Sequence, residues 1–264
     1  MVWIDRQRTS TKAEVMFQSI KKLYRETLRA LDGEIGHVND FYFDDKSWAV
    51  RYLVADTSSW ISGRLVLLAP HAFGSLHQDG KVLLVNLTRK QIENSPSIDT
   101  HKPVSRQYEE EYYQYYGWPS YWLGDSMWGI SDFPAVPPPT RPLSSEKPNT
   151  SGGHDERFDP HLRSTQAMSG YEIQASDGTI GHVSDFIMDE KRWAIRRLVA
   201  ETGHWFSGKE VLIPLSKIDR ISYEESKVFV NLTKEAILQA PEFHVPTLGA
   251  NEPDVQQLNQ DKPR

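Results

Sequence analysis

The sequence contains no cysteine among its 264 residues. A chain without thiols cannot form disulfides, cannot use a thiolate nucleophile and cannot bind a cysteine-ligated zinc ion or iron–sulfur cluster. It also has no apolar run approaching the roughly 18 residues of a membrane-spanning helix, and no signal-peptide segment at its start. We therefore expect a cytoplasmic protein without membrane insertion.

The chain also has little net charge. The formal net charge is −6, the two repeated segments identified below are nearly neutral, and residues 97–160 carry −5. Nucleic-acid binders generally present a basic face, because neutralisation of phosphates dominates their affinity. The charge distribution therefore does not favour a nucleic acid as the partner.

What the sequence does contain is an internal repeat at an offset of 145 residues. Residues 33–41, GEIGHVNDF, reappear at residues 178–186 as GTIGHVSDF, and the similarity continues without a gap to Pro96 and Pro241. Of the 64 aligned positions, 27 are identical. Two copies separated by a long insert indicate a duplicated domain and not a solenoid of stacked neighbouring units.

Each copy has the pattern of a small β domain. A polar cluster at residues 44–47 separates two apolar, β-rich runs, which is typical of a hairpin, and residues 189–192 repeat it. Five or six short strands in about 80 residues favour a closed barrel, because closure protects the edges of a sheet. Thr88 and Thr233 are expected to cap a short helix at the end of each copy.

The sequence predicts an organisation in six parts, of which the two copies are the folded domains. Translation starts either at Met1 or at Met16, where the repeated region begins. The six parts are a disordered tail at 1–15, a first barrel domain at 16–96, an aromatic arm at 97–134 with a helix from Ser105 to Tyr116, a Pro/Gly/Ser linker at 135–160, a second barrel domain at 161–242 and a disordered tail at 243–264.

Three repeated motifs, DGxIGHVxDF, WA[V/I]RxLVA and W[I/F]SG[R/K], resemble those of the PRC-barrel family. The resemblance covers residues 17–96 and 161–241. In addition, residues 104–110 and 115–119 resemble the segment that follows the barrel in bacterial tandem members. The expected fold is therefore mainly β: two small PRC-barrel-like β-barrels, each ending in a short helix, joined by the aromatic arm and the Pro-rich linker.

The family resemblance also carries functional expectations. It implies a six-stranded barrel that binds other proteins and has no shared catalytic site. In the H subunit of the photosynthetic reaction centre, this domain caps the reaction centre and influences electron transfer between quinones. In a ribosome maturation factor, it contacts a ribosomal protein. The present chain lacks the transmembrane helix of the H subunit.

Histidines and carboxylates recur at matching positions in the two copies. His37 and His182 each precede an aspartate, Asp40 or Asp185, by three residues. On an extended strand this offset places the two side chains on opposite faces, and neither histidine has the other ligands of a zinc site, so we interpret them as structural. The sequence predicts no catalytic residue, no metal site and no cofactor.

The remaining polar motifs have structural interpretations. The paired carboxylates at 44–45 and 189–190 fall in the expected hairpin turns. The GxxG pairs at 33–36 and 178–181 lack the strand-then-helix context of a phosphate-binding loop, and we interpret them as turn or bulge glycines. His71 and His77 have no counterpart in the second copy and are expected at the surface.

Aromatic side chains form the candidate protein interface. Trp48 and Trp193 are expected in the barrel cores, whereas the tryptophans at 60 and 205 either close one end of each barrel or are exposed interface residues. The three tyrosines at i, i+4 and i+7 of the expected helix share one face, which docks either on the first barrel or on a partner. The candidate interface residues are Trp60, Trp205, Tyr108, Tyr112, Tyr115, Trp118, Trp122 and Trp128.

These patterns predict a non-enzymatic protein-binding scaffold or adaptor. No motif identifies its protein partner, and two modes of association stay open: pairing of the two barrels about a pseudo-twofold axis, or a homodimer. One alternative is an accessory subunit of a membrane electron-transport or photosynthetic reaction centre complex. A second alternative is a factor associated with the ribosome or with RNA processing.

Overall fold

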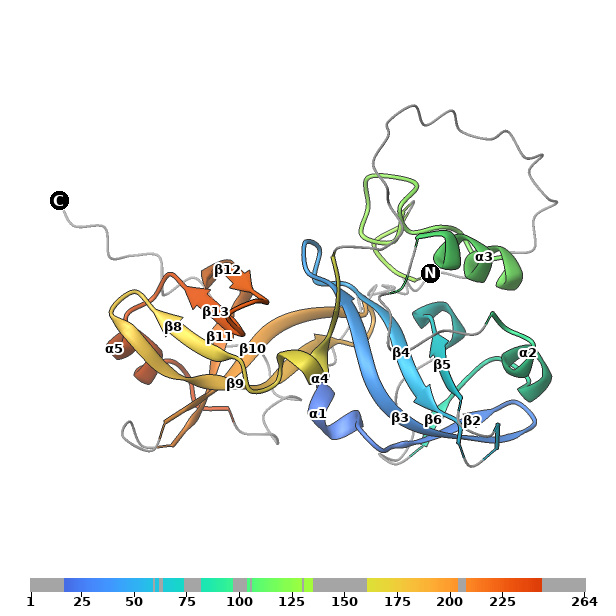
Figure 1. Ribbon diagram of the computed structural model, residues 1–264, viewed down its shortest axis with the longest axis horizontal. Helices are drawn as coiled ribbons and strands as arrows, with labels where there is room; N and C mark the ends of the chain where they lie inside the picture. The colour runs from blue at the N-terminus through green and yellow to red at the C-terminus, as the bar shows by residue number, and fades with distance from the viewer. Residues whose placement is uncertain are drawn as a thin grey trace, which may run out of the picture.

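A computed structural model describes residues 17–58, 60–61, 64–73, 82–96, 104, 106–129, 131–134, 161–203 and 208–243. The structure does not describe the expected tail at 1–15, the Pro-rich linker at 135–160, residues 244–264 of the second expected tail, Trp205 or His77. Phe243, which the prediction placed in the disordered tail, is instead 7% exposed, and its N–H donates to the carbonyl of Glu210. Below, the first half is residues 17–96, the arm is residues 97–134 and the second half is residues 161–243. Figure 1 shows the two halves side by side, with the arm along one side of the first half.

The two halves contain matching elements in the same order, except that β12 of the second half has no described counterpart in the first half. The elements of the first half are β1 (Phe17–Ser19), α1 (Ile20–Leu23), β2 (Thr27–Ala30), β3 (Gly33–Asp44), β4 (Val50–Asp56), β5 (Leu65–Leu68), η1 (Pro70–Ala72), β6 (Val82–Leu84) and α2 (Arg89–Glu93). The arm contributes α3 (Arg106–Tyr116). The second half contains β7 (Leu162–Ser164), α4 (Thr165–Met168), β8 (Glu172–Ala175), β9 (Gly178–Asp189), β10 (Ala194–Thr202), β11 (Glu210–Pro214), η3 (Leu215–Lys217), β12 (Ile218–Ser222), β13 (Lys227–Val230) and α5 (Lys234–Leu238).

The prediction of a mainly β fold is confirmed, but the structure corrects the prediction of closed barrels. One sheet has the order β5-β4-β3-β2-β6, and the other has the order β11-β10-β9-β8-β13-β12. Neither path returns to its first strand among the described residues, so both sheets are open. In the second half the chain turns through η3 between β11 and β12, and these two strands do not pair.

Each sheet takes one short strand from the other half of the molecule. β1 pairs antiparallel with β9, and β7 pairs antiparallel with β3. The first strand of each copy therefore belongs to the sheet of the opposite copy. In Figure 1 the helices that follow these strands, α1 and α4, lie next to each other between the two halves.

The two halves share most of their hydrophobic core. One buried cluster contains side chains from both sheets and from the arm, and the rings of Phe43 and Phe186 meet across the junction with centroids 5.9 Å apart. Because burial of apolar area is the main stabilising contribution to folding, this shared cluster stabilises the packing of the two halves and the arm on one another. Within the described segments, no helix has the length and apolarity needed to cross a membrane.

Local motifs in the two copies confirm several of the sequence predictions. Oδ1 of Asp44 accepts hydrogen bonds from the backbone N–H groups of Lys46 and Ser47, as expected for a hairpin turn. Thr88 forms a capping box with Gln91, and Thr233 caps α5. The short helices at the ends of both copies are therefore present.

The GxxG glycines are confirmed as residues beside β-bulges. Gly36 lies next to a register shift between β2 and β3, and Gly181 lies next to the corresponding shift between β8 and β9. A Cβ atom on Gly36 would stand 1.9 Å from the carbonyl oxygen of Asp56. Only glycine allows the neighbouring strand to approach so closely.

Candidate functional site

Two buried aspartates at equivalent positions join the halves. Asp185 accepts hydrogen bonds from the hydroxyl of Ser19 at 2.5 Å and from the backbone N–H of Lys21 at 2.9 Å. Asp40 accepts equivalent bonds from the hydroxyl of Ser164 and the N–H of Gln166. Each serine also caps the short helix that follows it. We call these two sets of contacts the serine–aspartate clasp.

The clasp holds its carboxylates away from water. Burial raises the pKa of both Asp40 and Asp185, while the hydrogen bonds from the serines and from backbone N–H groups oppose that shift. His37, three residues before Asp40, is exposed, and His182 lies 3.4 Å from the carboxylate of Glu201. The histidines therefore take no part in the clasp.

A second pair of equivalent residues, Trp48 and Trp193, joins the hairpin turns at the junction. Both have left-handed backbone conformations, with φ values of 60° and 50°. The carbonyl of Trp193 accepts a bond from the N–H of Val50 at 2.7 Å, and the carbonyl of Trp48 accepts one from Ile195 at 2.8 Å. These bonds to the opposite half offset the unfavourable left-handed conformation, which costs about 1–2 kcal/mol per residue.

Asp45, whose counterpart in the second copy is Glu190, is the centre of a polar cluster. Its carboxylate accepts hydrogen bonds from Nδ1 of His161 at 2.9 Å, Nε of Arg163 at 3.1 Å and the hydroxyl of Tyr223 at 2.7 Å. The guanidinium of Arg163 also lies 3.7 Å from the centre of the Tyr223 ring. Three side chains of the second half therefore hold one turn residue of the first half.

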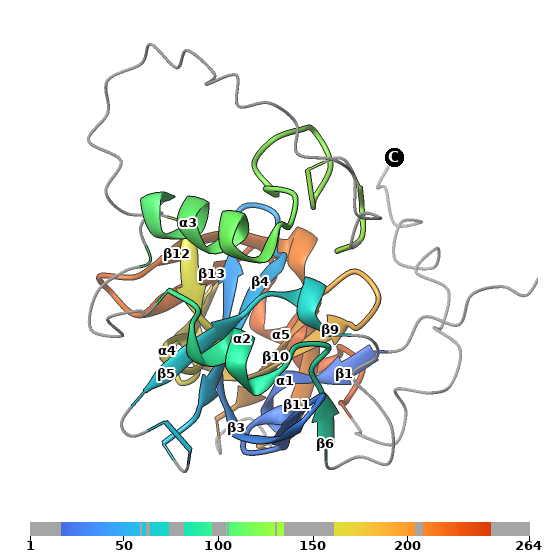
Figure 2. The same ribbon diagram turned by 90° about the vertical axis from the view of Figure 1, so that its right-hand side faces the viewer.

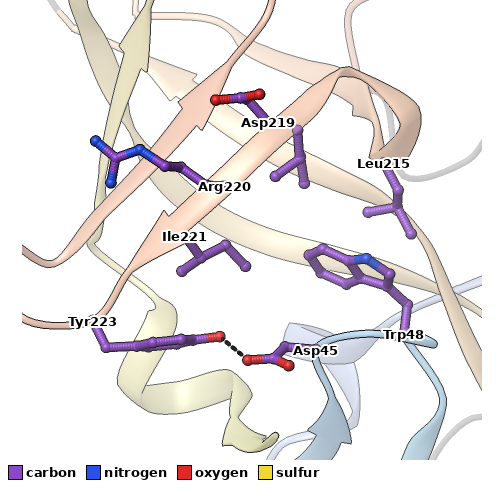
Figure 3. Close-up of a pocket in the computed structure, with 8 residues that line it drawn as sticks. Asp45, Trp48, Leu215, Asp219, Arg220, Ile221 and Tyr223 are labelled. Carbon is purple, nitrogen blue, oxygen red and sulfur yellow. Dashed lines mark hydrogen bonds between the residues drawn. The ribbon is translucent and has the colours of Figure 1, made fainter.

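A cavity of about 200 Å³ lies beside this cluster, between the 44–48 turn and β12. In Figure 3 the side chains of Trp48 and Ile221 point toward each other across the cavity, and the bond between Tyr223 and Asp45 closes one side. Asp219 and Arg220 point away from that space. The cavity lining therefore combines apolar side chains with polar and charged ones. The lining residues are Asp45, Trp48, Leu215, Ile218, Asp219, Arg220, Ile221 and Tyr223.

The arm packs on the sheet of the first half, beside β4 and β5 (Figures 1 and 2). The hydroxyl of Tyr112 donates to the carbonyl of Leu67 at 2.9 Å and accepts from the N–H of Ala69 at 3.0 Å. The buried carboxylate of Glu109 accepts from the hydroxyls of Tyr52 and Tyr121. These bonds supply polar partners inside an aromatic layer, so the layer can be buried at low cost.

The loop after α3 continues to the second half. The guanidinium of Arg51 lies between the rings of Tyr121, at 3.8 Å, and Trp128, at 4.9 Å, and it donates to the carbonyl of Met127. The indole N–H of Trp128 donates to the carbonyl of Arg192 at 2.8 Å. The arm is therefore a third link between the halves, in addition to the strand exchange and the clasp.

His71 lies inside the arm contact, which corrects the prediction that it is a surface residue. It is 3% exposed and stacks on Trp118, and the rings of Tyr113 and Trp128 lie nearly perpendicular to it. Its two ring nitrogens have no hydrogen-bond partner among the described residues. Burial, followed by the positive charge of Arg51, lowers the pKa of His71 to about 4.

The candidate interface residues divide by burial. Tyr112 and Trp128 are buried at 0% and 1% exposure, so they serve the arm's own packing and are unavailable to a separate partner. Tyr115 is 43% exposed. Trp60 is half-buried, with the guanidinium of Arg89 4.5 Å from its ring centre. The other three described candidates are half-buried, namely Tyr108, Trp118 and Trp122.

The arm also exposes apolar side chains, of which the sequence interpretation missed two, Leu123 and Phe133. Five large hydrophobic side chains of the described residues are prominently exposed, and three of them, Tyr115, Leu123 and Phe133, belong to the arm. Leu123 and Phe133 follow the helix, where no periodic pattern marks one face. The clasp serines were also missed, although Ser19 and Ser164 are 145 residues apart, as the repeat requires.

Comparison with known families gives one match. Residues 167–237 match the PRC-barrel domain, a stretch that begins in α4 and reaches α5. The match lies in the second copy, and the first copy is linked to the family by its resemblance alone. No curated protein matches the chain.

Proposed function

Because the chain carries a PRC-barrel domain at residues 167–237, we propose that it is a non-catalytic scaffold that binds another protein through the outer surface of its arm. The observation that carries this proposal is the exposure of Tyr115, Leu123 and Phe133 on one segment. Large apolar side chains exposed on one segment are typical of protein interaction sites.

The packing of the arm beneath this surface supports the proposal. On its inner side the arm is held by buried tyrosine hydroxyl bonds and by Trp128, which reaches the second half. A binding surface on a segment that is already held in place loses little conformational entropy when a partner docks, and this favours affinity. The half-buried rings of Trp118 and Trp122 are suitable side chains for the centre of such an interface.

The proposal can be tested by site-specific photo-crosslinking in the source cells. A photoreactive phenylalanine analogue replaces Leu123, which is 58% exposed on the arm, and in a matched control it replaces Leu31, which is 68% exposed between β2 and β3. We expect a discrete crosslinked protein at position 123 that is missing at position 31. The same proteins crosslinked at both positions, or none at either, would contradict the proposal.

Disruption of the surface gives a second readout. Leu123→Asp and Phe133→Asp together should abolish the crosslink formed from position 115, without changing the free energy of unfolding, because both side chains are exposed. The identity of the captured protein then decides between the functional classes. An integral membrane protein would assign the chain to a membrane complex, and a ribosomal protein would assign it to the ribosome.

A further inference from the structure

The pseudo-twofold relation between the halves produces two tryptophan sites at the junction that differ in one residue. In the first site, the ring of Phe73 packs on Trp193 with centroids 5.0 Å apart and an interplanar angle of 31°. Both side chains are buried, at 8% and 3% exposure. An aromatic ring therefore fills the space next to the tryptophan of the second half.

The second site has no such ring. Ile218 stands 145 residues after Phe73, and it lines the cavity of about 200 Å³ next to Trp48. Trp48 is only half-buried, and one face of its indole stacks on Phe43 with centroids 5.3 Å apart. The cavity therefore occupies the position that the phenylalanine ring fills in the equivalent site.

A bulge in β12 shapes the wall of this cavity. The register between β12 and β13 shifts between Ile218 and Arg220, and this shift places Ile218 and Ile221 in the same lining. The opposite wall is the indole of Trp48, and the hydroxyl of Tyr223 bound to Asp45 closes one side (Figure 3). The lining therefore offers the indole face of Trp48 and the side chains of Ile218 and Ile221 for apolar contact, and polar groups around them.

We propose that this cavity binds one aromatic side chain of a protein partner, packed on Trp48 as Phe73 is packed on Trp193. The inference rests on the proposed scaffold function, and it adds a second contact whose chemistry is specified. An apolar cavity of about 150 Å³ is sufficient to hold a benzene ring, so the volume fits a phenylalanine or tyrosine side chain. A tyrosine hydroxyl would reach the polar edge formed by Tyr223 and Asp45.

The backbone beside the cavity favours a polypeptide as the source of the ring. β12 is the last strand of its sheet, and among the described residues it pairs only with β13. An extended segment can add to such an edge through main-chain hydrogen bonds while one of its side chains enters an adjacent pocket. The edge and the cavity together form a site for an extended segment with an aromatic residue.

The test uses the full chain and a blocked Gly-Phe-Gly peptide, with Gly-Leu-Gly as the matched control. Binding is followed by NMR through the indole N–H signal of Trp48, which is assigned with a Trp48→Phe variant. We expect the phenylalanine peptide to shift this signal with a dissociation constant on the order of 1 mM, because a single ring makes few contacts. The leucine peptide should bind at least about tenfold more weakly.

Two variants make the result specific to the cavity. Ile218→Phe places in the second site the ring that the first site already contains, and it should reduce peptide binding about tenfold or more. Ile218→Ala keeps the cavity open and should retain binding. A peptide that shifts the Trp48 signal equally in wild type and Ile218→Phe would overturn the proposal, as would the absence of any shift up to about 10 mM.

Titration with toluene and 4-methylphenol distinguishes a small aromatic molecule from an aromatic side chain of a protein as the occupant of the cavity. If either binds more tightly than the peptide, the cavity is a small-molecule site and the assignment to a protein side chain is wrong. The arm crosslink from position 123 is measured independently of Trp48. If the crosslink is absent and the peptide binds, only the proposed function is overturned. If the crosslink forms and the peptide does not bind, only this inference is overturned.

Discussion

The two halves share 27 of 64 aligned residues, yet the same face of each sheet is covered in a different way. In the first half Tyr52 is fully buried beneath the arm and donates to Glu109. The equivalent residue of the second half, Arg197, is half-buried. There Phe243 and Phe17 pack instead on a small cluster made by Ile187, Val199 and Leu212.

The residues that are identical in the two copies form the strands and the junction. The residues that differ are those that contact the segment covering each sheet, which is different in the two halves. Ser19 and Ser164 are identical because both make the same clasp. His71 and Ser216 differ because only the first is enclosed by aromatic rings of the arm. The two copies of a duplicated domain can thus differ in the segments that cover them while they retain the same fold and the same contacts with each other.

Exchange of the residue beneath the arm between the two halves should give the largest difference in stability. Tyr52→Arg introduces the residue of the second half at a fully buried position, next to the buried Arg51. We expect a loss of about 4 kcal/mol in the free energy of unfolding, because a second charge is buried and the bond to Glu109 is lost. The reverse change, Arg197→Tyr, should stay within about 1 kcal/mol of wild type. Urea denaturation of both variants provides the measurement, and equal losses would show that the arm is not the cause of the difference.

The bulge glycines should behave alike in the two halves. A Cβ atom at Gly36 or Gly181 would lie 1.9 Å or 2.0 Å from a backbone carbonyl oxygen of the neighbouring strand. Gly36→Ala and Gly181→Ala should therefore each destabilise the protein by at least about 3 kcal/mol. Gly203→Ala is the control, because the backbone of Gly203 is not left-handed and the atom nearest to an added Cβ, the carbonyl oxygen of Ile180, lies 3.8 Å away. Thermal denaturation would contradict this view if the control lost as much stability as the bulge variants.

The clasp should also respond symmetrically. Ser19→Ala and Ser164→Ala each remove a helix cap and a hydrogen bond to a buried carboxylate, so we expect a loss of about 2 kcal/mol for each at pH 7. The serine bonds lower the pKa values of Asp185 and Asp40, which burial raises. The bond favours the ionised carboxylate, so the loss should diminish as pH falls through the folded pKa and the aspartates become protonated. A loss that stays constant from pH 7 to pH 4 would contradict this assignment.

His71 should give the first half a pH response that the second half lacks. Its pKa is lowered from 6.5 to about 4, so the folded protein disfavours the charged form, and stability is lost as pH falls below 6.5. At pH 5 this amounts to about 2 kcal/mol relative to pH 7. His71→Ser installs the residue found at position 216 and should remove this part of the pH dependence. The comparison requires denaturation curves of both proteins at pH 7 and pH 5, and parallel pH profiles would be inconsistent with it.

The smallest difference is expected at the terminal helices. Thr88 belongs to a complete capping box, whereas Thr233 has Ala236 at the position that Gln91 occupies in the first half. Thr88→Ala should cost about 1 kcal/mol, and Thr233→Ala should cost a few tenths less, since only one bond type is lost. A double-variant measurement should show that the two effects add, because the caps share no partner.

Several parts of the fold and the site could be predicted from the sequence because they depend on local rules. The hairpin turn at Asp44, the cap at Thr88 and the bulge at Gly36 each arise from residues close along the chain or from paired neighbouring strands. The helix of the arm also follows from its periodic tyrosines, and its range, Arg106–Tyr116, agrees with the expected one to within a residue. The placement of His71 and Tyr112 could not be predicted, because it depends on which surface the arm covers.

The duplication, the β-rich character of both copies, the turns, the caps and the resemblance to the PRC-barrel family can all be read from the sequence, because residue type and spacing act over a few residues or repeat along the chain. The exchange of β1 and β7 between the halves and the contact of Asp45 with Tyr223 depend on the tertiary structure, as does the failure of either described sheet to close on itself. These contacts join residues more than 100 positions apart, and they form because the shared core buries more apolar surface than either half alone. A repeat in a sequence reveals two similar units, whereas their mutual packing depends on shape and burial in three dimensions.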